Sequence, residues 1–300
     1  MTTAGGRYYD RRDGLWKTER VFAGVFLHWL YNTRAGGLLC RTITVSPWAS
    51  RLYGWAHRGS WSRRKVRRFV EALGVEPSEA LKPFDSFPSF ADFFVREIDL
   101  RRRPVHPEPD VCIAPADGRV LAFPRVEAVT TFSIKRCSFN LAGLLRDGAL
   151  TRTFAGGAMV VSRLSLADYH HFHFPVAGIA SAARSIPGSY HAGGPYALRT
   201  LVPFFTENHR MLTTLASDHF GLVGIVEIGA LTVGSIRQAY RPEARVARGE
   251  RKGRFELGGS TVVLLFEPGA IALDADLVSL TADGTESYVR MGESIGRGLR

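Results

Sequence analysis

The chain has 300 residues, of which 45% are hydrophobic and 22% charged, and its formal net charge at pH 7 is +11. This composition predicts a folded globular protein with a sizeable core, and it excludes the collagen-like, low-complexity and disordered classes. The three cysteines include no C-x-x-C pair, which argues against a disulfide framework or a cysteine-rich zinc site and favours a reducing compartment.

The positive charge lies at the N-terminal end. Residues 1–68 carry 14 Lys and Arg against 3 Asp and Glu, and all five tryptophans fall in the same segment. Apolar residues between 17 and 31 recur at the spacing of an amphipathic helix, and this stretch is too short to span a bilayer. Because indole rings prefer the headgroup boundary and arginine attracts phosphate, we expect this arm to bind an anionic membrane surface. A helix that packs on the core, or nucleic-acid binding, are the alternatives.

The first hundred residues are expected to form helices and loops, with a basic helix at 62–73 and a Phe-rich stretch at 84–94. Residues 100–109, with three arginines and three prolines, are typical of a linker. Short β-like runs separated by Gly and Pro follow, at 118–123, 158–164, 222–228, 231–236 and 261–266. We therefore predict an α+β fold, with a helical, basic, Trp-rich membrane-associating region at 1–100 and a β-rich catalytic body at 101–300.

Near the C-terminal end, Gly258 and Gly259 precede Ser260 and an apolar run. Two glycines between strand-like segments are ordinarily a hairpin turn. A serine there can also attack the carbonyl of the preceding glycine, since no Cβ obstructs the approach. That attack needs a base for the hydroxyl proton and, commonly, a third group that orients the base.

Two upstream segments could supply these groups. Asp117 lies in a Pro-Ala-Asp-Gly sequence, and His170, His171 and His173 cluster after a predicted strand. Each pattern is weak when taken alone. Asp-Gly usually marks a turn, and a histidine cluster is as often structural as catalytic, with metal binding as a third option.

Taken together, these segments resemble the phosphatidylserine decarboxylase family. The family's P-A-D-G matches 115–118, its Y-H-x-x-H-x-P-V-x-G matches 169–178, and its G-S-T with the following strand matches 259–266. Further similarities are G-A-x-x-V-G-S-I at 229–236, I-K…L-L at 134–145, and an entry sequence at 90–104. The resemblance covers about residues 85–270 in the same order.

The resemblance implies a self-processing enzyme. Asp117 would orient His173, and His173 would deprotonate Ser260, which attacks the carbonyl of Gly259. His170 would serve the decarboxylation, by contacting the substrate carboxylate or by managing a proton. The histidine that follows it is expected to have a structural role.

Cleavage between Gly259 and Ser260 would give a long β chain and a short α chain that begins with a pyruvoyl group derived from Ser260. This covalent cofactor would accept a substrate amine and act as an electron sink, so neither a metal nor pyridoxal phosphate is expected. The implied reaction converts phosphatidylserine to phosphatidylethanolamine in phospholipid biosynthesis. The expected partners are an aminophospholipid substrate and an anionic membrane, at the cytoplasmic face of the cell membrane. No nucleic acid is expected, and relatives suggest a homodimer of the cleaved heterodimer.

Three departures from the family pattern bear on these expectations. Gly258 stands where many relatives have leucine, the loop at 187–195 lacks the family's asparagine, and Asn208-His209-Arg210 stands for N-E-R. The last two could alter headgroup recognition. Alternative functions are a pyruvoyl decarboxylase of a soluble amino acid, a non-catalytic lipid-binding pseudoenzyme, and a metal-dependent hydrolase that uses the three histidines.

Overall fold

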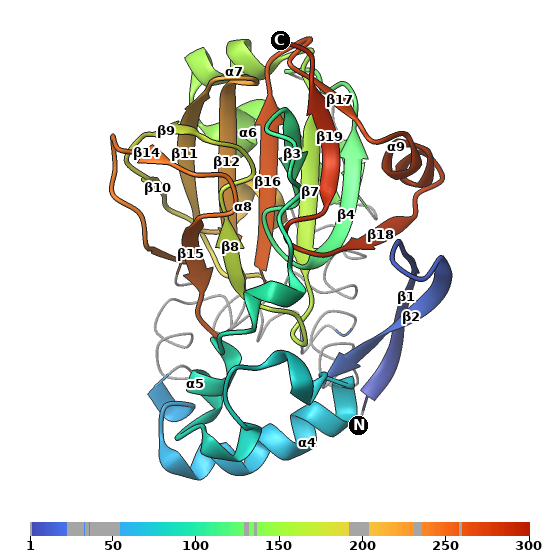
Figure 1. Cartoon of the computed structure of the whole chain (residues 1–300), viewed down its shortest axis with the longest axis vertical. Helices are drawn as coiled ribbons and strands as arrows, with labels where there is room; N and C mark the ends of the chain where they lie inside the picture. Colours follow the sequence, from blue (N-terminus) through green and yellow to red (C-terminus); the bar gives the residue numbers. More distant parts are fainter. Residues whose placement is uncertain are drawn as a thin grey trace.

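The computed structural model describes residues 2–22, 33, 36, 55–128, 132–134, 137–191, 204–230, 236–257 and 260–300. In these residues an eleven-stranded sheet forms the centre of the molecule (Figure 1). Its pairings are antiparallel, except that β1 runs parallel to β18. The order along the sheet is β14 (Arg245–Val246), β9 (Gly178–Ala180), β11 (Arg210–Ser217), β12 (Gly221–Gly229), β16 (Ser260–Phe266), β7 (Met159–Leu164), β4 (Gly118–Phe123), β18 (Glu286–Val289), β1 (Thr2–Asp10) and β2 (Leu15–Phe22), with β10 (Arg184–Ile186) beside β11.

Three smaller sheets pack around this one. They consist of β13 (Ile236–Gln238), β15 (Arg251–Phe255) and β8 (His171–His173); of β17 (Ile271–Leu273), β19 (Ser294–Gly298) and β3 (Val111–Ile113); and of β5 (Phe132–Ile134) and β6 (Cys137–Phe139). The helices are short: η2 (Ser60–Arg63), α4 (Arg64–Leu73), η3 (Pro77–Glu79), η4 (Phe84–Ser86), α5 (Phe90–Phe94), η5 (Leu100–Arg102), α6 (Leu141–Leu145), α7 (Gly148–Phe154), α8 (Phe204–Glu207) and α9 (Ala275–Ala282). The described chain is therefore β-rich with few helices, as predicted.

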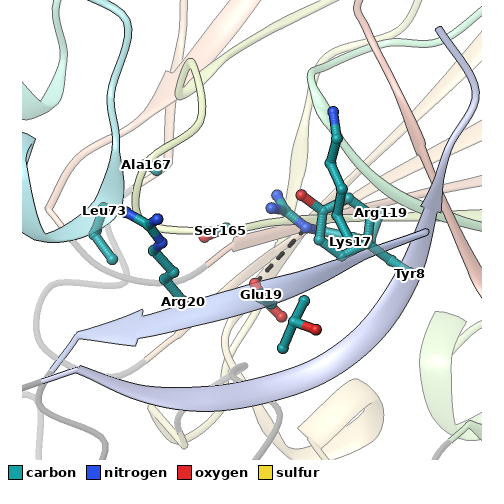
Figure 2. Close-up of a pocket in the computed structure, with 9 residues that line it drawn as sticks. Tyr8, Lys17, Glu19, Arg20, Leu73, Arg119, Ser165 and Ala167 are labelled. Carbon is teal, nitrogen blue, oxygen red and sulfur yellow. Dashed lines mark ion pairs between the residues drawn. The ribbon is translucent and has the colours of Figure 1, made fainter. Parts of the chain in front are cut away.

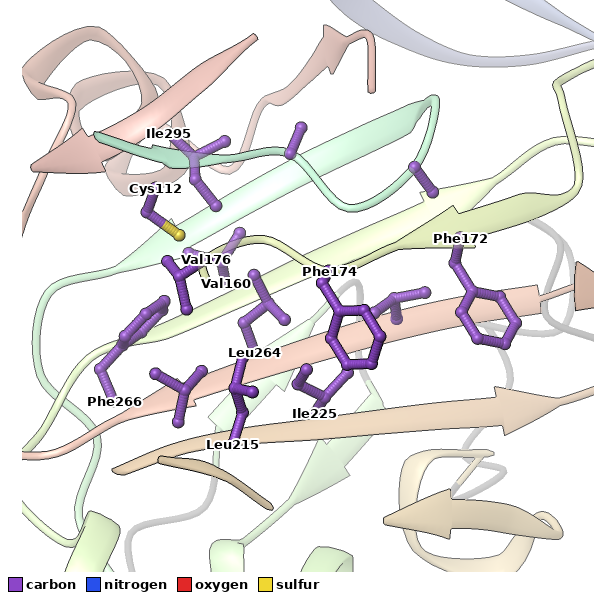
Figure 3. Packing of buried hydrophobic residues seen from close by; sticks show 14 of the residues in the cluster. Cys112, Val160, Phe172, Phe174, Val176, Leu215, Ile225, Leu264, Phe266 and Ile295 are labelled. Carbon is purple, nitrogen blue, oxygen red and sulfur yellow. The ribbon is translucent and has the colours of Figure 1, made fainter. Parts of the chain in front are cut away.

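The continuous apolar sequence of β16 is explained by burial on both faces. Val262, Leu264 and Phe266 pack into one core, which Figure 3 shows, while Val263 and Leu265 pack into a second core on the opposite face. Strand β16 lies between β12 and β7, so it is central in the sheet. The residue that begins it is therefore held by neighbours on both sides.

A third core lies below the sheets, where residues of α4 and α5 pack together (Figure 1). The buried face of α4 is formed by Val66, Phe69 and Leu73, at helical spacing, and the helix ends where Gly74 takes up a left-handed conformation. The same cluster contains Leu257, two residues before the predicted cleavage site. The N-terminal helical elements thus pack directly against the segment that leads to Ser260.

Most of the predicted elements are confirmed. Strands occur at 118–123, 159–164, 221–229 and 260–266, and a helical segment occupies 60–73. Of the predicted run at 231–236, only Ile236 lies among the described residues. The predicted linker at 100–109 contains a 3-10 turn, and Arg103 within it is buried. The predicted division of the chain into an N-terminal region and a catalytic body at residue 100 stays a prediction.

The amphipathic helix predicted from residue 17 is wrong for residues 17–22, which belong to strand β2; residues 23–31 lie outside the described residues. Strand β2 pairs with β1 through a tight turn in which Gly14 has a φ of 70°. The cause is long-range: the buried carboxylate of Glu19 accepts two hydrogen bonds from Arg163 of β7, at 3.1 and 2.8 Å. Arg163 also binds Glu286 of β18, so an ion-pair cluster attaches the hairpin to the sheet.

Candidate active site

Ser260 is the first residue of β16 and lies in register between Gly229 of β12 and Leu164 of β7. Gly258 and Gly259 lie outside the described residues, as does the side chain of Ser260. The position of the predicted cleavage site is nevertheless clear from the backbone: it comes where β15 has ended and the central strand begins.

Strand β15 links this site to the histidines. It pairs with β8, so that Arg251 lies opposite His173 and Arg254 opposite His171. The backbone N–H of Phe255 donates to the carbonyl of His170 at 2.9 Å. The chain that passes the histidines therefore continues directly into the segment before Ser260.

His173 is buried, and its hydrogen bonds define its tautomer. Its Nδ1 contacts the carbonyl oxygen of Gly249 at 2.9 Å, and its Nε2 lies 3.4 Å from the hydroxyl of Tyr169. A carbonyl can only accept, so Nδ1 carries the proton. Burial lowers the pKa of His173, against the opposing effect of the Gly249 bond, and so favours the neutral ring. Its Nε2 is then unprotonated, as a general base requires, and accepts the long hydrogen bond of the Tyr169 hydroxyl.

Asp117 is held by groups other than His173. Its carboxylate accepts hydrogen bonds from Arg103 at 2.9 and 2.7 Å, and from the backbone N–H of Met291 at 2.9 Å. Arg103 also donates a hydrogen bond to Glu79. The guanidinium of Arg103 therefore joins Asp117 of the catalytic body to the N-terminal region. No hydrogen bond between Asp117 and His173 is present among the described residues, so the predicted orienting role stays a prediction.

The segment of Asp117 nevertheless lies against that of His173. The backbone N–H of His173 donates to the carbonyl of Pro115 at 2.7 Å, and the charge of Asp117 favours the protonated form of His173. Gly118 allows the close approach of β4 to β7, because a Cβ there would lie 2.8 Å from the carbonyl oxygen of Arg163. The two predicted motifs thus meet in the folded chain.

His170 is completely buried and neutral. Its Nδ1 contacts the carbonyl of Asp168 at 2.9 Å, and its ring lies against that of Phe94 with centroids 3.9 Å apart. Burial, with the nearby charge of Arg96, lowers the pKa of His170 to about 3. Its Nε2 has no hydrogen-bond partner among the described residues. His170 therefore offers a buried, unprotonated acceptor, which suits a hydrogen-bond donor better than a carboxylate.

His171 has a different environment. Its ring stacks on Tyr169 with centroids 4.8 Å apart, and its Nε2 contacts the carbonyl of Val95 at 3.0 Å. Burial lowers its pKa to about 4. These contacts agree with the structural role expected for it. In the described part of the chain, no group of three His, Cys, Asp or Glu side chains could hold a metal ion.

A buried ion pair beside the histidines was missed by the sequence analysis. Lys252 lies where the register of β15 shifts, and its Nζ is 2.7 Å from Oε1 of Glu227 on β12. It also donates to Thr213 and Gln238, at 3.0 and 2.8 Å. Burial lowers the pKa of Lys252 and raises that of Glu227. A single carboxylate inside the apolar run at 222–228 was the signal that could have predicted a buried partner.

The segment Asn208-His209-Arg210, in which His209 departs from the family pattern, lies beside the central sheet. Asn208 is buried and joins the loop before it to the central sheet, by hydrogen bonds to the backbone of His191 and to the carbonyl of Gly229. Arg210 donates to four backbone carbonyls, at Gly143, Leu144, Thr206 and Asn208. Asn208 therefore holds the backbone of Gly229, the register partner of Ser260, and Arg210 holds the carbonyls of α6 and α8. Residues 192–195 of the divergent loop lie outside the described residues.

A pocket of about 330 Å³ lies between the β1–β2 hairpin and the body (Figure 2). The ion pair between Glu19 and Arg119, at 3.7 Å, crosses it. Its wall includes Ser165 and Ala167, which follow the register partner of Ser260. The full lining is Tyr8, Lys17, Thr18, Glu19, Arg20, Leu73, Arg119, Ser165 and Ala167.

Comparison with known proteins agrees with this site. The family model described as phosphatidylserine decarboxylase matches residues 90–297. The chain belongs to the phosphatidylserine decarboxylase family. Phosphatidylserine decarboxylase proenzymes of Chlamydia felis and Chlamydia trachomatis are 41% and 40% identical to it, over 98% and 97% of this chain and 98% and 96% of theirs. The proenzyme of Chlamydia pneumoniae is 39% identical, over 98% of both chains.

The similarity extends beyond the residues that the family model matches, since the chlamydial proenzymes align over nearly the whole chain. The family model and these relatives confirm the predicted family. None of the helices in the described residues is long and apolar enough to cross a membrane.

Proposed function

We propose that this chain cuts itself between Gly259 and Ser260 and then decarboxylates phosphatidylserine to phosphatidylethanolamine. The observation that carries the proposal is the buried, neutral His173, whose unprotonated Nε2 can accept a proton beside the segment that leads to Ser260. The name proenzyme, borne by relatives that align over almost the whole chain, supports self-processing.

In the cleavage step, the hydroxyl of Ser260 attacks the carbonyl carbon of Gly259, and His173 accepts the hydroxyl proton. The peptide bond becomes an ester, and its nitrogen becomes the amine of residue 260. Elimination then releases a chain that ends in the carboxylate of Gly259. Hydrolysis of the remaining dehydroalanine releases ammonia and leaves a pyruvoyl group at the start of β16.

The residues present suit that group. The start of β16 is held between two strands, and His170 and His173 each offer an unprotonated nitrogen in a buried setting. Once formed, the pyruvoyl group supplies a ketone for the substrate amine and a carbonyl that delocalises the charge left by carbon dioxide. We assign His170 to the substrate amine, since its unprotonated Nε2 can accept a hydrogen bond from the ammonium group that must lose a proton.

The decisive experiment compares the wild-type chain with Ser260→Ala on a denaturing gel and by intact mass. We expect wild type to yield a fragment of residues 260–300 whose first residue lacks an amine, while Ser260→Ala stays at 33.1 kDa. Ser279→Ala, at an exposed serine of α9, is the matched control and should be cleaved normally. A wild-type chain that stays intact with phosphatidylserine vesicles would favour the pseudoenzyme instead.

We also propose that the N-terminal region binds the surface of an anionic membrane. Helix α4 and the turn before it carry five exposed basic residues, and the indoles of Trp55 and Trp61 beside them are 73% and 54% exposed. Such a surface combines attraction to anionic headgroups with shallow insertion. The five residues are Arg63, Arg64, Lys65, Arg67 and Arg68.

Flotation with anionic and with neutral vesicles tests this surface. We expect binding to anionic vesicles only, and its loss in Arg67→Glu/Arg68→Glu. The control is Arg297→Glu/Arg300→Glu, which makes the same change of charge at the C-terminal end. Equal loss in both double variants would argue against a local membrane surface. The homodimer stays a prediction, for which light scattering of the cleaved protein is the measurement.

A further inference from the structure

Arg96 is a buried cation that forms no ion pair with the residues that the structure describes. It follows α5, is 5% exposed, and its Nη2 donates to the carbonyls of Ala167 and Asp168 at 2.6 and 3.4 Å. Its Nη1 is buried and has no hydrogen-bond acceptor among the described residues. Burial lowers its pKa to about 10, so the guanidinium remains charged at neutral pH. A buried charge in this state is costly unless an anion completes it.

Arg96 and His170 form one unit. The carbonyl oxygen of Asp168 lies 3.4 Å from Nη2 of Arg96 and 2.9 Å from Nδ1 of His170. Each side chain also keeps one buried nitrogen without a partner in the described structure: Nη1 of Arg96, which is a donor, and Nε2 of His170, which is an acceptor. Together they suit a ligand that has an anionic group near an ammonium group.

The unit lies next to the predicted cleavage site. The carbonyl of His170 accepts the N–H of Phe255, and Leu257 packs in the same apolar cluster as Phe94. Ala167, whose carbonyl binds Arg96, also lines the pocket beneath the hairpin (Figure 2). A ligand at Arg96 would thus lie beside the segment that leads to Ser260.

We propose that Arg96 binds the phosphodiester of the aminophospholipid substrate, an inference that rests on the proposed function. The substrate has two anionic groups, the carboxylate and the phosphodiester, and the reaction changes the charge of only one of them. The carboxylate loses its charge as carbon dioxide leaves, so a cation bound to it would stabilise the ground state more than the transition state. The phosphodiester keeps its charge throughout, so binding it costs the reaction nothing.

The test compares two soluble substrates in wild type and Arg96→Met. Dihexanoyl phosphatidylserine carries both anionic groups, whereas an O-alkyl-L-serine of similar length lacks the phosphate. Loss of a charge-assisted hydrogen bond should raise KM for the phospholipid about 10- to 100-fold. Because Arg96 binds the phosphodiester equally in the ground state and in the transition state, kcat should change little. The kinetics with O-alkyl-L-serine should not change, since this substrate has no phosphate. Arg96→Lys, which keeps the charge, should recover part of the loss.

Other outcomes would overturn the inference. An equal effect on both substrates would assign Arg96 to the carboxylate or to the support of His170, and an uncleaved Arg96→Met would assign it to self-processing. An unchanged KM would exclude a substrate contact. Arg101→Met, at an exposed arginine of the same segment, is the control and should match wild type. If wild type itself neither cleaves nor decarboxylates, the proposed function fails first.

Discussion

Replacing Asp117 with asparagine removes a buried carboxylate that holds Arg103 in place. Both side chains are 1% exposed, and the two are joined by hydrogen bonds of 2.9 and 2.7 Å, with the N–H of Met291 as a further donor. Breaking a buried ion pair by removing one partner costs about 3–5 kcal/mol. Glu79 still accepts from Arg103 at 2.9 Å and offsets part of this. We therefore expect the free energy of unfolding to fall by about 2–4 kcal/mol.

Urea unfolding in a Ser260→Ala background measures this loss without interference from cleavage. Arg103→Met should be at least as destabilising, because it leaves the carboxylate of Asp117 buried and unpaired. The double variant should cost less than the sum of the singles, with a coupling of about 1–3 kcal/mol. Asp110→Asn is the control, since its ion pair with Arg297 is at the surface, and it should cost less than about 1 kcal/mol.

A coupling below about 0.5 kcal/mol would refute the view that this ion pair anchors the segment. Self-cleavage of the same variants, now with Ser260 restored, separates the two roles of Asp117. If Arg103→Met is cleaved normally while Asp117→Asn stays intact, Asp117 acts on His173, as the family resemblance implies. If both variants lose cleavage in proportion to stability, the role of Asp117 is to hold Arg103.

Three further predictions follow from buried charges. Lys252→Met leaves the carboxylate of Glu227 buried and should lower the free energy of unfolding by about 3–5 kcal/mol, whereas the double variant with Glu227→Leu should recover most of it; no recovery in urea unfolding would contradict this. His170 and His171, with pKa values of about 3 and 4, are neutral when folded and take up protons on unfolding below pH 6.5. The free energy of unfolding should therefore decrease as the pH is lowered from 7.5 to 5, by about 2 kcal/mol for each histidine. His171→Gln should show a shallower pH dependence. A free energy of unfolding that does not change with pH would count against buried neutral rings. Glu19→Gln weakens the attachment of the hairpin and should cost about 1–3 kcal/mol in urea unfolding, with an unchanged midpoint as the contrary result.

The sequence by itself determined the central strands and the positions of the motifs. The apolar run of β16 predicts a strand because a chain buried on both faces needs apolar side chains at every position. The helix at 60–73 was predictable from its spacing, since Val66, Phe69 and Leu73 recur on one face. The co-occurrence of the sequence motifs around Asp117, His173 and Ser260 was sufficient to identify the family.

Only the tertiary structure decided which groups these residues contact. Glu19 places residues 17–22 in a strand because its partner is Arg163, which lies 144 residues further along the chain. Asp117 binds Arg103, and the bond that sets the tautomer of His173 comes from the backbone carbonyl of Gly249. Helical spacing is a property of neighbouring residues, whereas an ion pair or a carbonyl contact depends on where distant segments meet. The local sequence pattern does not show which distant segments come together, so these contacts could be identified only in the folded structure.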